Sequence, residues 1–244
     1  MDTRTTAEPS WTGLYLTGAI SAALFVALTI LSAVVIALTP QPPSTGAAGT
    51  LPAAVATLPY IAAHKYVYLL NMVLFVGPVA LTAIVFLALF VALRPVSRSS
   101  AAIGAMIGVA SVVLCLTPFT LLFALVPLSD QYAAATSAAQ RATSVAMADG
   151  LLAQVNAVSV GGILFAVGVL VISLAMLKGV FQKAVAILGI VSGVVGIVCE
   201  SLRPVMGSWY GIYGILMLWL LAVAWKLHRL STRGGAEATP AVRG

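Results

Sequence analysis

Two residues of opposite charge lie three positions apart at the boundary between two long apolar runs. Glu200 and Arg203 end one run, and Gly207 and Trp209 lead into the next. On an α-helix, residues at this spacing share a face and can form an ion pair. The pair either caps and positions the turn between two helices, or it forms one wall of a polar pocket that binds a ligand.

Four other polar residues are spaced so that they pair on helix faces. His64 and Asn71 are seven positions apart, and so are Asp149 and Asn156, which corresponds to about two helical turns. These positions fall at the outer ends of predicted helices, so we expect one outward-facing pocket. Its candidate ligand-binding residues are His64, Asn71, Asp149, Asn156, Glu200 and Arg203. The alternative is that the two asparagines make hydrogen bonds between helices, worth about 0.6 kcal/mol each, and bind nothing.

The remaining reactive residues do not form a recognisable active site. Cys115 and Cys199 are the only cysteines and lack a CxxC arrangement, which is typical of small buried side chains. His64 and His228 fall on opposite sides of the predicted membrane, so they cannot share a metal or a haem. The sequence has no HExxH, GxSxG, Walker A or GxGxxG motif. We therefore expect no catalytic residue, no metal and no cofactor.

The composition requires a membrane. A soluble domain carries roughly 25% charged residues, whereas this chain carries 7% and is 61% hydrophobic. Its apolar runs are long enough to cross a hydrocarbon core of about 30 Å as helices. The sequence therefore predicts an all-α, polytopic membrane protein in a lipid bilayer, with six transmembrane helices in one bundle.

The apolar runs set the predicted domain boundaries. A polar N-terminal tail covers residues 1–13, and a disordered C-terminal tail covers residues 231–244. A loop with five prolines follows the first span over residues 39–59, and Ser129 or Asp130 is expected to cap a helix near the surface. The predicted spans within the transmembrane domain, residues 14–230, are 14–38, 67–93, 101–126, 151–177, 184–202 and 207–225.

The net charge of +6 comes from basic residues that lie singly at the ends of apolar runs. This pattern is typical of topology determinants and not of a surface that follows a nucleic-acid backbone, so we expect no nucleic acid as a partner. Cytoplasmic termini leave Lys65, Arg141 and Arg203 outside. The same orientation places nine basic residues inside, namely Arg4, Arg94, Arg98, Lys178, Lys183, Lys226, Arg229, Arg233 and Arg243. The bias predicts that both termini are cytoplasmic.

Two glycine pairs predict close helix contacts. Gly104 and Gly108 form one small-xxx-small pattern, and Gly189 and Gly193 form another, which lets two helix backbones approach each other. We expect packing inside one protomer. A contact with a second copy or with another membrane protein is the alternative.

Three features of the layout resemble a known family. They are the polar segment Ser129–Tyr132 after the third span, the basic turn at Lys178–Lys183, and the closing run SWYGIYGILMLWLLAVAWKLHRL over residues 208–230. The chain resembles a large family of uncharacterised bacterial six-helix integral membrane proteins that is known only as a domain of unknown function. The resemblance covers about residues 14–230 and implies a fold and a location in the bacterial inner membrane, but no activity or site.

Together these features predict a non-enzymatic, multi-pass cell-membrane protein. Its outward polar cluster is expected to bind a small ligand or a lipid headgroup, as in a sensor, an accessory subunit or a small permease. The alternative is a structural protein that binds another membrane protein through its glycine-rich helix faces. An intramembrane enzyme is the least favoured alternative.

Overall fold

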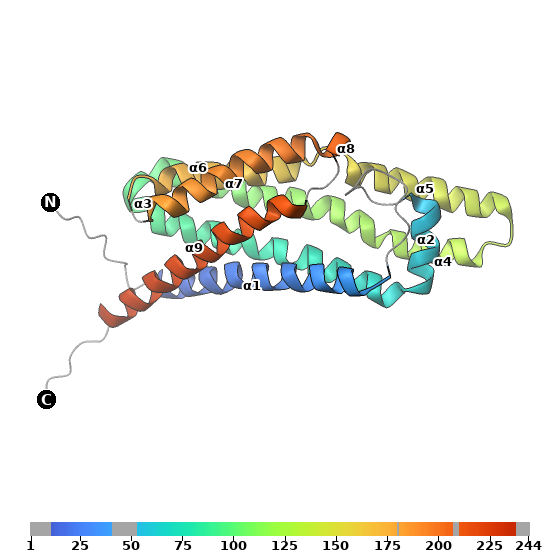
Figure 1. Cartoon of the computed structure of the whole chain (residues 1–244), viewed down its shortest axis with the longest axis horizontal. Coiled ribbons are helices and arrows are strands. Elements are labelled where there is room, and N and C mark those ends of the chain that lie inside the picture. The colour runs from blue at the N-terminus through green and yellow to red at the C-terminus, as the bar shows by residue number, and fades with distance from the viewer. Residues whose placement is uncertain (1–10, 41–52, 180, 207–209, 238–244) are drawn as a thin grey trace, which may run out of the picture.

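The computed structural model describes residues 11–40, 53–179, 181–206 and 210–237. Within these ranges the chain forms α-helices and no β-strand (Figure 1), which confirms the prediction of an all-α protein. Gly207 and Trp209 lie outside the described residues, as do residues 1–10 and 238–244 of the predicted tails and residues 41–52 of the proline-rich loop. The helices are α1 (Thr12–Leu38), α2 (Ala54–Ala63), α3 (Lys65–Phe123), α4 (Leu125–Ala134), α5 (Ala138–Asn156), α6 (Val160–Met176), α7 (Lys183–Ser201), α8 (Arg203–Met206) and α9 (Tyr210–Glu237).

Five described stretches are long and apolar enough to cross a membrane. Between 28% and 33% of the most apolar window in each stretch is buried inside the protein, so most of these side chains keep exposed surface. An α-helix satisfies its own backbone hydrogen bonds, as a chain in lipid must. The length, composition and outward apolar surface of these helices are those of an integral membrane protein.

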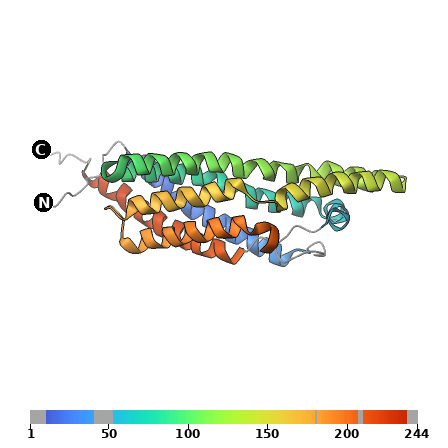
Figure 2. The same cartoon turned by 90° about the horizontal axis from the view of Figure 1, so that it is seen from above.

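The long helix α3 consists of two arms that fold back on each other at Ser97. Ser97 leaves the helical region with φ −153° and ψ 77°, just after Pro95, which has no backbone N–H to donate. The Tyr68 hydroxyl of the first arm donates a hydrogen bond of 2.8 Å to the Leu122 carbonyl of the second. Figures 1 and 2 show the two arms side by side. The break that the sequence predicts between the spans 67–93 and 101–126, at Arg94 to Arg98, is therefore present.

The main core joins α1, α3, α6, α7 and α9. α1 packs against α3 and α9, while α6 packs against α3 and α7. Trp219 of α9, Phe86 of α3 and Ile172 of α6 are fully buried in it. The start of α1 and the end of α9 lie at the same end of this bundle (Figure 1).

A second, smaller core lies at the opposite end, where α2, α4 and α5 form what we call the end module. Leu58 and Ile61 of α2, Leu125 of α4 and Leu152 of α5 are buried together. Figure 1 shows these three helices gathered beyond the end of the bundle. The Ser129 hydroxyl of α4 donates a hydrogen bond of 3.0 Å to the Leu58 carbonyl, which ties α4 to α2.

Several boundaries differ from the sequence-based prediction. Residues 54–59 belong to α2 and not to a loop, because the apolar face of α2 is buried in the end module. The predicted span 151–177 is broken at residues 157–159 between α5 and α6. Ser137, and neither Ser129 nor Asp130, caps α5 through a capping box with Gln140. The last helix extends to Glu237, past the predicted start of a disordered tail at residue 231.

Candidate functional site

Glu200 and Arg203 form the ion pair that their spacing predicts. Arg203 Nη1 lies 3.3 Å from Glu200 Oε2, and the two side chains are 18% and 14% exposed. Glu200 lies in the last turn of α7 and Arg203 begins α8, with Leu202 between the two helices. Figure 1 shows α8 at the same end of the protein as the end module. The pair is thus mostly buried, at one end of the apolar helices.

The first turn of α6 packs against Glu200 and against the second arm of α3. A Cβ added to Gly162 would lie 2.8 Å from Glu200 Cδ, and one added to Gly161 would lie 2.7 Å from the Cys115 backbone nitrogen. Gly162 donates its backbone N–H to Ser159 Oγ at 3.0 Å. Glu200 therefore lies at a junction of α3, α6 and α7, and we call this the Glu200 junction.

Asp149 has a structural partner. The Ala54 backbone N–H donates a hydrogen bond of 2.9 Å to Asp149 Oδ1, so a carboxylate from α5 caps the first residue of α2. A side-chain cap of this kind is worth about 1 kcal/mol. The sequence could not indicate this contact, since the two residues are 95 positions apart.

His64 lies at the other end of α2. It ends α2 and precedes α3, and its ring centroid is 5.2 Å from that of Tyr60. Burial raises the pKa of the Tyr60 hydroxyl above its ordinary value. Since α2 has ten residues and a helix rises about 1.5 Å per residue, roughly 15 Å of helix separates His64 from Asp149.

The two asparagines occupy different surroundings. Asn71 is 7% exposed, one turn beyond Tyr68 on the first arm of α3, and its Oδ1 has no hydrogen-bond partner among the described residues. Asn156 is the last residue of α5 and is half-buried. Of the six predicted residues, the structure thus joins Glu200 to Arg203 directly and separates His64 from Asp149.

An ion pair that the sequence analysis missed links α3 to α4. Lys65 Nζ lies 2.6 Å from Asp130 Oδ1, and the side chains are 35% and 56% exposed. An exposed pair of this kind stabilises a fold by about 0–1 kcal/mol. The partners are 65 positions apart, so no local spacing rule could have found the contact.

The predicted glycine pairs face helices of the same chain. Gly104 lies against Ile172 of α6, Gly108 against Phe86, Gly189 against Ser173 and Trp219, and Gly193 against Leu170. Gly168 of α6, which the sequence analysis did not single out, lies against the backbone of Gly108, where an added Cβ would be 2.9 Å from the Gly108 Cα. These glycine faces are therefore covered within the protomer.

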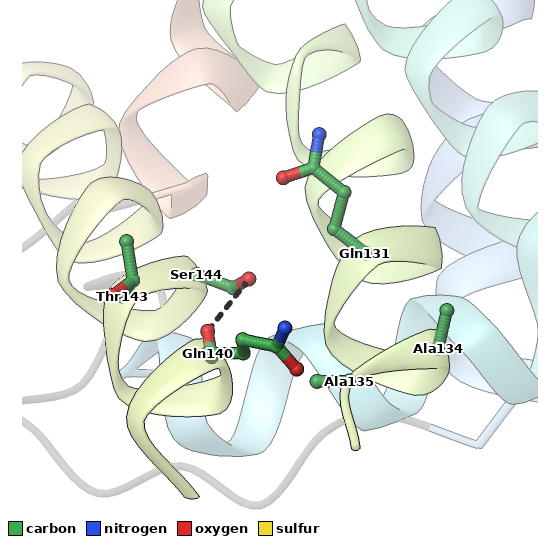
Figure 3. Close-up of a pocket in the computed structure, with 6 residues that line it drawn as sticks. All are labelled: Gln131, Ala134, Ala135, Gln140, Thr143 and Ser144. Atoms are coloured by element: carbon green, nitrogen blue, oxygen red, sulfur yellow. Dashed lines mark hydrogen bonds between the residues drawn. The ribbon is translucent and has the colours of Figure 1, made fainter. Parts of the chain in front are cut away.

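A hollow of about 400 Å³ lies between α4 and α5. Figure 3 shows the side chains that line it, which are Gln131, Ala134, Ala135, Gln140, Thr143 and Ser144. None of these residues was predicted as a site. Gln140 Oε1 already accepts the backbone N–H groups of Thr136 at 3.0 Å and Ser137 at 3.2 Å. The polar groups here stabilise the turn between α4 and α5. We therefore interpret the hollow as a feature of that turn and not as a ligand site.

No group of three or more histidine, cysteine or acidic residues in the described part of the chain is placed to hold a metal ion. Comparison with curated proteins and with solved structures gave no match. The sequence profile of the domain of unknown function DUF4386 matches residues 20–228, from within α1 to within α9. As the resemblance in its layout implied, the chain belongs to the DUF4386 family.

Proposed function

We propose that the protein crosses a bacterial cell membrane six times, with both termini in the cytoplasm. One of the five apolar stretches, Lys65–Ala134, is 70 residues long and contains the fold-back of α3 at Ser97. Counting its two arms separately yields six passes. An even number of passes agrees with the start of α1 and the end of α9 lying at the same end of the bundle (Figure 1).

The distribution of charge supports this orientation. The end of the bundle that holds the α3 turn and the α6–α7 turn, which we call the basic end, carries Arg94, Arg98, Lys178, Lys183, Lys226 and Arg229. Lys65, Arg141 and Arg203 lie at the other end, together with Asp130, Asp149 and Glu200. Basic residues accumulate on the cytoplasmic side of membrane proteins, so the end module and the Glu200 junction face outwards.

We propose that the Glu200 junction binds a small polar ligand or a lipid headgroup that carries both charges. The observation that carries this proposal is the mostly buried ion pair, with side chains 14% and 18% exposed, at the outward end of the helices. A ligand with an ammonium and a phosphate or carboxylate group could exchange for the internal partners. Arg203 would then bind the anion in its guanidinium fork, and Glu200 would bind the cation.

This role is that of a binding protein and not of an enzyme. It fits a sensor, an accessory subunit or a small permease, each of which can use a polar site at the outward end of its helices. The alternative of a protein partner bound through the glycine pairs has less support, since Gly104, Gly108, Gly189 and Gly193 all face side chains of their own protomer.

A thermal-shift screen in detergent tests the proposal on wild type, Glu200→Gln and a control, Ser201→Ala. Ser201 is exposed, and its hydroxyl donates to the Ile197 carbonyl of its own helix. The panel contains amino acids, phosphoethanolamine, phosphocholine and dispersed phosphatidylethanolamine. A ligand at 100 times its Kd stabilises the folded state by about 2.7 kcal/mol. We expect one chemical class to stabilise wild type and Ser201→Ala but not Glu200→Gln.

A second variant changes the position of the Glu200 carboxylate and leaves its charge unchanged. Gly162→Ala keeps the charge of Glu200 but displaces its carboxylate, because the new Cβ would lie 3.0 Å from Oε2. We expect the same loss of ligand stabilisation as for Glu200→Gln. Equal stabilisation of all the variants by every active compound, or no stabilisation of wild type by any compound, would refute the proposal.

A further inference from the structure

Four basic residues gather on two neighbouring turns at the basic end. Arg94 and Arg98 flank the turn of α3 at Ser97, and Lys178 and Lys183 flank the turn between α6 and α7. The two turns touch, since a Cβ on Gly179 would lie 3.3 Å from the Val96 methyl groups. Phe181 in the second turn is 5% exposed and belongs to the main core, which holds that turn in place.

No acidic side chain that the structure describes lies near Arg98, Lys178 or Lys183. Among residues whose side chains the structure describes, the acidic ones are Asp130, Asp149 and Glu200, and all three lie at the opposite end of the protein. Arg98, Lys178 and Lys183 are exposed, and no described carboxylate forms an ion pair with any of them. Arg98, Lys178 and Lys183 thus form an exposed group of cations on the adjoining turns that can accept an anion.

Aromatic residues place this surface at the depth of lipid headgroups. The Arg94 guanidinium lies 5.3 Å from the centroid of a Trp11 ring, and that of Arg229 lies 4.0 Å from the centroid of a Trp225 ring. Tryptophan is enriched at the boundary between membrane and water, and a cation over its ring is held by the charge distribution of the aromatic face. Arg94 is therefore held in place beside the three exposed cations.

Apolar side chains continue from the cations toward the bilayer. Ile187 is 54% exposed and lies one turn into α7 from Lys183, so the two side chains share a helix face. Leu177, next to Lys178, is 42% exposed. A phosphate at the lysines would thus have apolar surface directly below it, which a free phosphate ion cannot use and an acyl chain can.

From this arrangement we infer that the α3 turn and the α6–α7 turn together bind the headgroup of an anionic phospholipid. Arg98, Lys178 and Lys183 contact its phosphate. Arg94, which is held over the Trp11 ring, adds positive charge beside them. The acyl chains run along Ile187 and Leu177. This site lies at the opposite end of the protein from the Glu200 junction and does not depend on it.

Native mass spectrometry of the full-length protein in detergent tests the inference, with phosphatidylglycerol and phosphatidylcholine as probes. Each cation near an anionic lipid surface contributes about 1 kcal/mol, which is about fivefold in affinity. The double variant Arg98→Gln/Lys183→Gln is therefore expected to bind phosphatidylglycerol about 25-fold more weakly. The charge-preserving Arg98→Lys/Lys183→Arg should bind like wild type, and so should Arg141→Gln, which removes a cation at the other end.

Three results would overturn the inference. The first is equal affinity of wild type for phosphatidylglycerol and phosphatidylcholine. The second is an unchanged affinity in Arg98→Gln/Lys183→Gln, or an equal loss in the charge-preserving variant. The third is displacement of phosphatidylglycerol by millimolar inorganic phosphate, which would make a free anion and not a lipid the ligand. Both altered side chains are exposed, and the thermal stability of each variant without added lipid checks that it is folded.

Discussion

Replacing Gly168 with alanine should weaken the contact between α3 and α6, the most extensive helix pair in the described chain. The new Cβ would lie 2.9 Å from both the Cα and the N of Gly108, and 3.2 Å from the Gly104 carbonyl oxygen. These are backbone atoms, so no side chain can rotate out of the way. An ordinary contact begins near 3.4 Å, and the two helices must therefore separate by about half an ångström.

That displacement sets the expected magnitude. A gap of roughly 0.5–1 Å removes a quarter to a half of the dispersion energy of each contact across it, and overpacking of a core typically costs about 1–3 kcal/mol. Alanine also gains about 0.8–1.0 kcal/mol over glycine in helix propensity. A control with the same gain and no steric cost is Gly214→Ala in α9, where nothing lies within 4 Å of an added Cβ.

The assay is reversible unfolding of the purified protein in mixed detergent micelles, with the free energy of unfolding measured for both variants. The propensity gain cancels between them, so the difference reports the steric cost alone. We expect Gly168→Ala to be less stable than Gly214→Ala by about 1–3 kcal/mol. Equal stability, or a more stable Gly168→Ala, would refute the conclusion that backbone contact between α3 and α6 limits the size of residue 168.

Three other substitutions test separate contacts. Gly189→Ala should also destabilise the protein by about 1–3 kcal/mol, because the added methyl meets Ser173 and Trp219; unfolding by the same method checks this. Asp149→Ala removes the cap of α2, at a cost of about 0.5–2 kcal/mol, so amide hydrogen exchange should accelerate in α2 and not in α6. Asp130→Asn breaks an exposed ion pair, so stability should fall by less than about 1 kcal/mol, and the loss should shrink at high salt.

Local pattern determined much of the architecture. Because lipid forces each spanning segment to satisfy its own hydrogen bonds, apolar runs of sufficient length predict helices, and the helices are present. The turn between Arg94 and Arg98 and the pairing of Glu200 with Arg203 were also predictable, because each depends on residues only a few positions apart. The family resemblance likewise rested on the order of segments along the chain.

Tertiary contacts decided the rest. Residues 54–59 read as part of a proline-rich loop, yet they belong to α2 because Leu58 and Ile61 of that helix are buried against α4 and α5. Asp149 has the spacing of a pocket residue, yet its carboxylate caps α2 through a backbone group 95 positions away. Gly168 looks like any other glycine in an apolar run until the fold places it against Gly108. Local spacing fixes which residues share a helix face, but the opposing helix is chosen by packing between segments distant in the chain.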